Sequence, residues 1–312
     1  MKYFIKKFCT LIITLFIISF VTFLAFQVIP GDSAVTALGT DASPEQVEAL
    51  RESYGLNKNI AERYGDWLFH AARGDFGESV NYGIPVGELV GDRFFVTAGL
   101  GILSILIIVV LSLPLGILSA KKEGGLWDRL ITLISQIGMA VPPFFLGMLI
   151  TLLFGIVLKW FIPGRYVSFS ESPAGYLHYM IFPALAIAVP KTAMMVKFLR
   201  SSVLRQMKSD YVRTARSKGN TENKVLYRHV LKNALIPVIT FLGMVIADVL
   251  AGSIIIEQVF NLPGMGRLLI VGISNRDFPV VQAIVLYIAV LVIMVNFIVD
   301  MIYRLIDPRI TV

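Results

Sequence analysis

The sequence predicts an all-α integral membrane protein with six transmembrane helices, and three observations support this fold class. Of the 312 residues, 56% are hydrophobic and 16% are charged, whereas soluble domains average roughly 45–50% and about 25%. Six long apolar segments are separated by polar ones, and the mean hydropathy is +0.76. Basic residues gather in alternate connecting segments. One globular core could not hide so many apolar side chains, so much of this surface must face lipid.

The first apolar segment, residues 8–29, contains no charge and follows Lys2, Lys6 and Lys7. At 1.5 Å per residue, about 22 residues cross a hydrocarbon core of about 30 Å. A cleaved signal peptide is the competing interpretation, but its apolar region has only about 7–15 residues. We expect the remaining spans at residues 94–120, 131–162, 179–199, 234–258 and 278–303.

The net charge of +7 could indicate nucleic-acid binding, so the positions of the bases matter. Residues 197–232 contain ten bases and two acids, a net charge of +8. The N-terminus and the loop 121–130 also carry more bases than acids, and the C-terminal end adds Arg304 and Arg309. With six spans all these segments share one side, which the positive-inside rule identifies as the cytoplasm. We therefore expect a multi-pass protein of the inner (cytoplasmic) membrane with both termini in the cytoplasm and no nucleic-acid partner.

Residues 30–95 carry eleven acids and five bases, and this topology places them outside the cell. Ser43 and Gln46, with Pro44 between them, predict a capped helix start. A second short helix is expected around residues 60–71. The predicted organisation is a first transmembrane helix at 1–29, an external helical loop at 30–95, a five-helix core at 96–304 and a cytoplasmic tail at 305–312.

Few residues could support catalysis. The chain has no Gly-Lys pair and so no G-x-x-x-x-G-K-[ST] phosphate loop, and we expect neither enzyme activity nor a cofactor in this chain. His70 and Asp75 have the H-x-x-x-x-D spacing of membrane acyltransferases, but one spacing is weak evidence, and we interpret the pair as a polar patch. The single cysteine, Cys9, excludes an intramolecular disulfide. No motif predicts a metal site.

Two charged residues lie near the centres of predicted spans, Lys191 in 179–199 and Asp248 in 234–258. A charge at the bilayer centre costs at least about 2.5–3.5 kcal/mol, so it usually faces water or a partner. The two side chains therefore either line a translocation path or pair with each other. Small residues recur every four positions on both helices and predict that the two pack closely: Ala184, Ala188 and Thr192 on one, Gly243, Ala247 and Ala251 on the other.

The strongest functional signal is the basic segment 197–232. Apolar residues are interleaved with its bases, which is typical of short helices. Gly219 provides a turn between them, because glycine adopts positive φ without penalty. Binding of anionic lipid is one interpretation, worth about 1 kcal/mol per base. The ordered Asp210, Tyr211, Ala215 and Gly219 positions favour a protein-binding site instead.

The order of motifs along the chain resembles the permease subunits of bacterial ABC importers, in the oligopeptide, dipeptide and nickel branch. Residues 210–219 (DYVRTARSKG) resemble that branch's cytoplasmic EAA loop, and residues 232–237 (KNALIP) continue it. Arg213 stands where the general importer pattern has Glu, and His229 and Lys232 replace its later Ile and Pro, as is common in the peptide branch. Further matching motifs cover nearly the whole chain, at residues 30–32, 54–56, 74–77, 114–116, 262–266, 275–279 and 307–310.

This resemblance implies the MetI-like permease fold, with two homologous permeases forming the pore within the lipid bilayer. Two ATPase subunits, which hold ATP and magnesium, would bind the cytoplasmic loops, and an extracellular binding protein or lipoprotein would deliver substrate. The coupling loop 200–234 would contain a helix that docks in the ATPase and drives alternating access. The residues implied are Asp210, Tyr211, Arg213, Ala215, Gly219, Arg228, His229 and Asn233 for the coupling loop, and Lys191, Asp248 and Glu257 for a candidate translocation path.

Three functions remain open at this point. Peptides are the expected substrate of such an importer. Nickel or a metal chelate is the alternative, because Asp248 and Glu257 favour a cation. An ATP-independent channel or secondary transporter, with Asp248 as the coupling site, is the alternative class of protein, and the EAA-like loop favours the importer over it.

Overall fold

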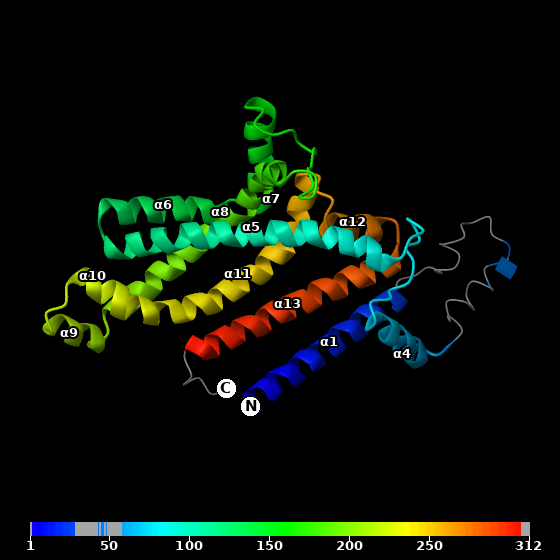
Figure 1. The fold of residues 1–312 in the computed structure, drawn as a ribbon, viewed down its shortest axis with the longest axis horizontal. Helices are drawn as coiled ribbons and strands as arrows, with labels where there is room; N and C mark the ends of the chain where they lie inside the picture. Colours follow the sequence, from blue (N-terminus) through cyan, green and yellow to red (C-terminus); the bar gives the residue numbers. More distant parts are fainter. Residues whose placement is uncertain (1, 29–42, 44, 47, 49–57, 307–312) are drawn as a thin grey trace. The chain divides into compact units, whose positions relative to one another are not determined.

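The computed structural model describes residues 2–28, 43, 45, 46, 48 and 58–306 (Figure 1). Within these ranges the chain is helical, and the only β-type pairing is an isolated bridge between Glu78 and Pro85. Contacts divide the protein into two compact units, each with its own core. The first unit comprises residues 1–95 and 264–293, and the second comprises residues 96–263 and 294–312.

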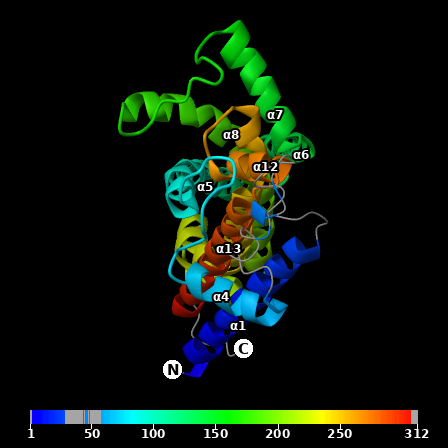
Figure 2. The same ribbon diagram turned by 90° about the vertical axis from the view of Figure 1, so that its right-hand side faces the viewer.

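In the first unit, helix α1 (Lys2–Val28) packs against the short helix α4 (Ile60–Ala71), and Figure 2 shows α4 lying beside α1. Tyr64 of α4 is buried, and its hydroxyl shares a 2.8 Å hydrogen bond with Ser19. The Tyr64 ring also makes an edge-on contact with Phe20, at 5.1 Å between centroids. The amphipathic helix α4 thus covers part of the apolar helix α1, and its Tyr64 provides a hydrogen-bond partner for the Ser19 hydroxyl.

The helices expected between residues 30 and 95 are confirmed where the structure describes them. Ser43 and Gln46 form a reciprocal capping box: the Ser43 backbone N–H donates to Gln46 Oε1 at 3.0 Å, and the Gln46 N–H donates to Ser43 Oγ at 3.3 Å. The other expected helix is α4, which begins after Asn59, whose side chain accepts a hydrogen bond from the Glu62 N–H at 3.0 Å. Pro44 and the motifs at 30–32, 54–56 and 307–310 lie outside the described residues.

A second cluster of the first unit joins the start of α5 (Val86–Lys121) to α12 (Met265–Ser274) and the start of α13 (Phe278–Ile306). Asp277, fully buried, fixes the loop before α5 onto the turn before α13. Its carboxylate accepts hydrogen bonds from the Ser79 hydroxyl, from the Val80 N–H at 3.3 Å, and from the backbone and side-chain amides of Asn81 at 3.2 Å. A charged group is tolerated here because several donors surround it.

The second unit is arranged around helix α8 (Pro173–Met207), whose middle is almost entirely buried. Its neighbours include the rest of α5, α6 (Leu126–Ala140), α7 (Pro143–Ile150) and α11 (Leu231–Val259). Close approach depends on small residues: a Cβ on Gly116 of α5 would lie 2.8 Å from Leu199 Cδ2, so only glycine fits there. The two views show α8 running among the other helices of this unit (Figure 1, Figure 2).

Five described helices are long and apolar enough to cross a membrane: α1, α5, α8, α11 and α13. The expected span at 131–162 is bent, which was not predicted from the sequence. This segment breaks at Val141 and Pro142 into α6 and α7, whose axes differ by 97°, and α7 continues into a π-helix at Thr151–Val157. The break has a local cause, because a residue before proline avoids the helical region and proline cannot donate a hydrogen bond. The protein thus has five spans, or six if the bent pair crosses as one.

We predict that Asp277→Asn destabilises the first unit. The substitution puts an amide NH₂ among donors that now bond a carboxylate, and an unsatisfied buried group costs about 1–3 kcal/mol. Thermal unfolding of the detergent-solubilised protein should therefore occur several degrees lower than in the wild type. The exposed neighbour Glu78 offers a control, and Glu78→Gln should unfold at the wild-type temperature. Equal midpoints for the two variants would contradict the role assigned to Asp277.

Candidate functional site

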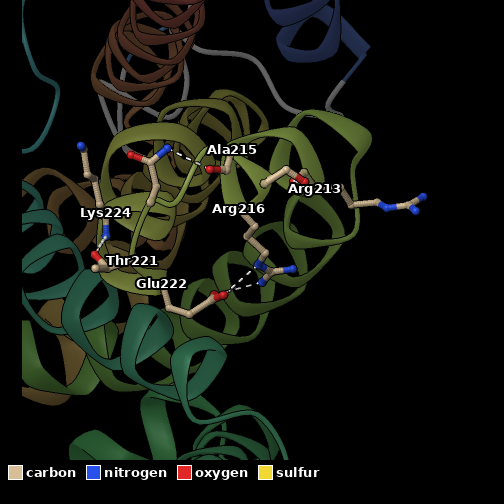
Figure 3. Close-up of polar contacts among 8 residues, drawn as sticks. Arg213, Ala215, Arg216, Thr221, Glu222 and Lys224 are labelled. Atoms are coloured by element: carbon tan, nitrogen blue, oxygen red, sulfur yellow. Dashed lines mark hydrogen bonds and ion pairs between the residues drawn. The ribbon is translucent and has the colours of Figure 1, made fainter.

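The basic segment folds into a short helical excursion between α8 and α11. It consists of α9 (Asp210–Ser217), α10 (Glu222–Lys224) and the π-helix η2 (Val225–Val230). Helix α9 is amphipathic: Val212 and Ala215 are buried, whereas the Arg213 side chain is 80% exposed. Figure 3 shows Arg213 pointing away from the rest of the excursion. The buried side chains hold α9 on the protein and leave its polar face free to contact another molecule.

The turn after α9 is fixed by its own polar contacts. Gly219 has φ +76°, a conformation that L residues with side chains rarely adopt. Beyond it, the Asn220 amide donates to the Ala215 carbonyl at 2.9 Å. Arg216 forms a two-pronged ion pair with Glu222, with Nε and Nη2 at 2.8 and 3.0 Å from the two carboxylate oxygens (Figure 3). The sequence-based expectation that Gly219 provides a turn between two helices is confirmed.

The excursion is also anchored to the helices of the second unit. Three residues of η2 are buried: Val225, Leu226 and Val230. The Ser202 hydroxyl of α8 donates to the Ala234 carbonyl of α11 at 2.8 Å and joins the two helices where the excursion begins and ends. Movement of α9 would therefore be transmitted directly to α8 and α11.

The other residues expected to contact a partner differ in their exposure to solvent. Tyr211 is half-buried and donates from its hydroxyl to Gln206 Oε1 at 2.9 Å, so it supports the start of α9. Arg228 is exposed on η2, whereas His229 is half-buried and its carbonyl accepts a 3.3 Å hydrogen bond from the Asn233 amide. The exposed charged residues of α9 are Asp210, Arg213 and Arg216, and the exposed Lys218 follows directly after the helix.

One cluster near the basic segment was missed at the sequence level. Asp128 is 4% exposed and pairs with Arg200 of α8, at 2.6 Å to Nε and 2.8 Å to Nη2. The Ser119 hydroxyl of α5 and the Gly124 N–H complete its shell, at 2.6 and 2.8 Å. The cluster ties α5, α6 and α8 together. Arg200 counted only as one of ten bases in the sequence, because residues 72 positions apart give no local signal of pairing.

Lys191 and Asp248, near the centres of their helices, form an ion pair: Lys191 Nζ lies 2.7 Å from Asp248 Oδ2. The expectation that α8 and α11 pack together is confirmed. Of the small residues expected at the contact, Ala184, Ala188 and Thr192 of α8 are buried.

The small residues expected on α11 have different surroundings: Gly243 is buried, Ala247 is half-buried and Ala251 is exposed. A Cβ on Gly243 would lie 2.8 Å from Val299 Cγ1 of α13, so the close approach is to that helix. The face of α11 that is buried instead contains Val238, Val245 and Val249, whose branched side chains fill more space than the small residues would.

Two further sequence candidates have local explanations. Glu257 is fully buried, and one carboxylate oxygen accepts a 2.6 Å hydrogen bond from the Thr97 hydroxyl of α5, so it does not face an open path in this structure. His70 and Asp75 do meet, at 3.1 Å, but both are exposed, and Asp75 also accepts the Gly77 N–H at 3.0 Å. These hydrogen bonds, above all that from Gly77, hold the pKa of Asp75 below its usual range. The pair therefore stabilises a turn, in keeping with the interpretation as a polar patch.

Comparison with known proteins identifies the family. The model for the inner membrane component of binding-protein-dependent transport systems matches residues 112–312, and the corresponding N-terminal model matches residues 1–101. The chain belongs to this family. It is the permease subunit of a binding-protein-dependent ABC importer, embedded in the inner membrane by several spans.

Relatives of this permease match it over nearly their whole length. A putative peptide transport system permease of Brucella abortus is 36% identical over 306 residues, which cover 98% of both chains. An oligopeptide transport system permease of Bacillus subtilis is 37% identical over 296 residues, 94% of both chains. A glutathione transport system permease of Pectobacterium atrosepticum is 37% identical over 310 residues, 99% of both chains. The family match favours an importer subunit over an ATP-independent channel.

The ion pair between Lys191 and Asp248 predicts a rescue by charge exchange. Lys191→Asp or Asp248→Lys alone places two like charges together near the centre of the membrane, which is strongly unfavourable. Each single variant should therefore accumulate in the membrane at a much lower level than the wild type and unfold at lower temperature.

The double variant Lys191→Asp with Asp248→Lys restores opposite charges at the same positions. Its membrane level, measured by immunoblot of isolated membranes, should recover most of the wild-type value. Two defective single variants and an equally defective double variant would rule out the pairing.

Proposed function

We propose that this permease subunit forms half of the translocation pathway of a peptide importer and works by alternating access. The observation that carries this proposal is the ordered excursion from α9 to η2. It joins two membrane helices, presents a charged face, and is braced by the Arg216 and Glu222 ion pair. A rigid connector of this kind can receive a push from a partner and pass it to both helices.

The partner proposed for this face is an ABC ATPase. Arg213 would contact it directly, since its side chain is 80% exposed and makes only a distant ion pair, at 3.8 Å, with Asp210. The shape of the docking surface would be maintained by residues that pack or turn beneath it: Tyr211, Ala215, Gly219 and Asn233. In this arrangement ATP and magnesium belong to the ATPase, and this chain contributes no cofactor of its own.

The rest of the proposed assembly follows from the family. A second, homologous permease would complete the pathway, two ATPase subunits would dock on the cytoplasmic excursions, and an extracellular binding protein or lipoprotein would deliver cargo. Both termini would then lie in the cytoplasm, on the same side as α9, in accord with the distribution of bases. This orientation requires the bent pair of α6 and α7 to cross the membrane once.

Peptides are the cargo that the relatives support best. Their names specify peptide, oligopeptide and glutathione transport. In the part of the chain that the structure describes, no group of three or more metal-binding side chains occurs. Nickel would thus have to be recognised elsewhere in the assembly.

We predict that Arg213→Glu uncouples the importer without unfolding it. The side chain lies in solvent, so its reversal leaves the buried face of α9 intact but presents a repulsive charge to the ATPase. Peptide uptake in cells that depend on this importer should fall about tenfold or more, and the ATPase should no longer co-purify with the permease. Membrane levels of the permease should stay normal.

The matched control is Arg165→Glu, which reverses another exposed arginine far from the excursion. It should leave uptake and co-purification unchanged. Peptide uptake that continues in cells without any ATPase partner would show that the chain is not part of an ABC importer.

A further inference from the structure

The exposed residues of α11 form a single stripe. Apart from Lys232 near its start, all the exposed residues of this helix are spaced three or four positions apart, which places them on one face. They are Thr240, Met244, Asp248, Ala251, Ile255 and Gln258. From first to last the stripe extends over about 27 Å at 1.5 Å per residue, almost the thickness of the hydrocarbon core.

Contact of this stripe with lipid would be energetically unfavourable. Asp248 lies near the middle of the stripe, and its side chain is 58% exposed in the chain as it stands. A carboxylate at this depth costs at least about 2.5–3.5 kcal/mol against lipid, so the face that bears it must meet water or a polar partner. Thr240 and Gln258 place further polar groups near the two ends.

The ion pair is built asymmetrically. Lys191 is recessed, with 18% of its side chain exposed, whereas Asp248 is 58% exposed. In the part of the chain that the structure describes, the hydrogen bond to the Asp248 carboxylate comes from Lys191 and reaches Oδ2. A carboxylate can accept about four hydrogen bonds. Lys191 therefore orients the carboxylate from behind, while Oδ1 and the outer side of the group stay available.

We propose that Asp248 binds the protonated amino group of the cargo as the cargo passes the centre of the membrane. A primary ammonium group supplies the opposite charge and three N–H donors, and a charge-assisted hydrogen bond to a carboxylate is among the stronger polar contacts. Lys191 is the positioning residue. This inference rests on the proposed function, because peptides with a free N-terminus carry such a group.

The decisive variant removes both charges together. Lys191→Met with Asp248→Asn leaves no unpaired ion, and replacing a whole ion pair is often neutral for stability. In the native host, with the chromosomal copy deleted, the variant should reach the membrane at the wild-type level. It should take up labelled alanine peptides of two to five residues about ten- to a hundredfold more slowly. Arg165→Gln is the control and should transport normally.

The exchanged pair separates a structural role from a binding role. Lys191→Asp with Asp248→Lys keeps the ion pair but presents a cation on the stripe. We expect it to recover the membrane level and thermal stability yet transport the same peptides as slowly as the charge-free variant. Recovery of uptake together with stability would overturn the proposal, and so would normal uptake by the charge-free variant.

Water access to the stripe is tested independently. Cys9 is the only cysteine, so a Cys9→Ser background allows single labelling sites. Met244 lies one turn from Asp248 on the stripe and is exposed, so Met244→Cys keeps the ion pair intact. In the assembled importer it should react with a hydrophilic thiol reagent, and alanine peptides should slow that reaction. Ile134→Cys, on the exposed apolar face of α6, is the lipid-facing control. Absence of labelling at position 244 would overturn the inference.

Failure of the inference is distinguishable from failure of the proposed function. If the wild-type importer takes up no peptide in the presence of its binding protein, the proposed cargo is wrong. If it takes up peptides and the charge-free variant does so equally well, only the role of Asp248 is wrong.

Discussion

Two ion pairs on helix α8 fix the arrangement of the second unit. Lys191 meets Asp248 of α11, and Arg200 meets Asp128 of α6. Inside an apolar bundle an unpaired charge is so unfavourable that each partner has one acceptable position. The neighbouring helices are thereby held in register along α8, where small residues such as Gly116 permit the close contact.

This constraint connects the membrane helices to the excursion from α9 to η2. Helix α8 runs from the half-buried Lys191 through Arg200 and reaches α9 within a few residues of its end. A force on α9 therefore acts on a helix that is held by two ion pairs, at Lys191 and at Arg200. Because the helices are closely packed, they move together and not one by one. Such a construction suits alternating access, in which an event at the cytoplasmic surface must change the exposure of a path near the membrane centre.

Much of the fold was predictable because the membrane imposes a simple length rule. Long apolar runs identified α1, α5, α8, α11 and α13, although Lys191 interrupts the run of α8, and the capping residues Ser43 and Gln46 identified a helix start. The run at 131–162 was recognised as well, but its bend was not. Pro142 breaks the helix there, and hydropathy carries no information about the direction of the backbone. A run of apolar residues thus indicates that a segment lies in the membrane, but it does not determine how many times the segment crosses the bilayer.

The sequence by itself determined the membrane class, the basic segment, the turn at Gly219 and the presence of two charges at mid-membrane depth, because composition and local spacing control these features. Only the tertiary structure decided which charges pair and which way they face. It joined Lys191 to Asp248, found Asp128 for Arg200, and turned Glu257 inward to Thr97. The reason is physical: pairing depends on helix rotation and close packing, and these are set by side chains far apart in the chain.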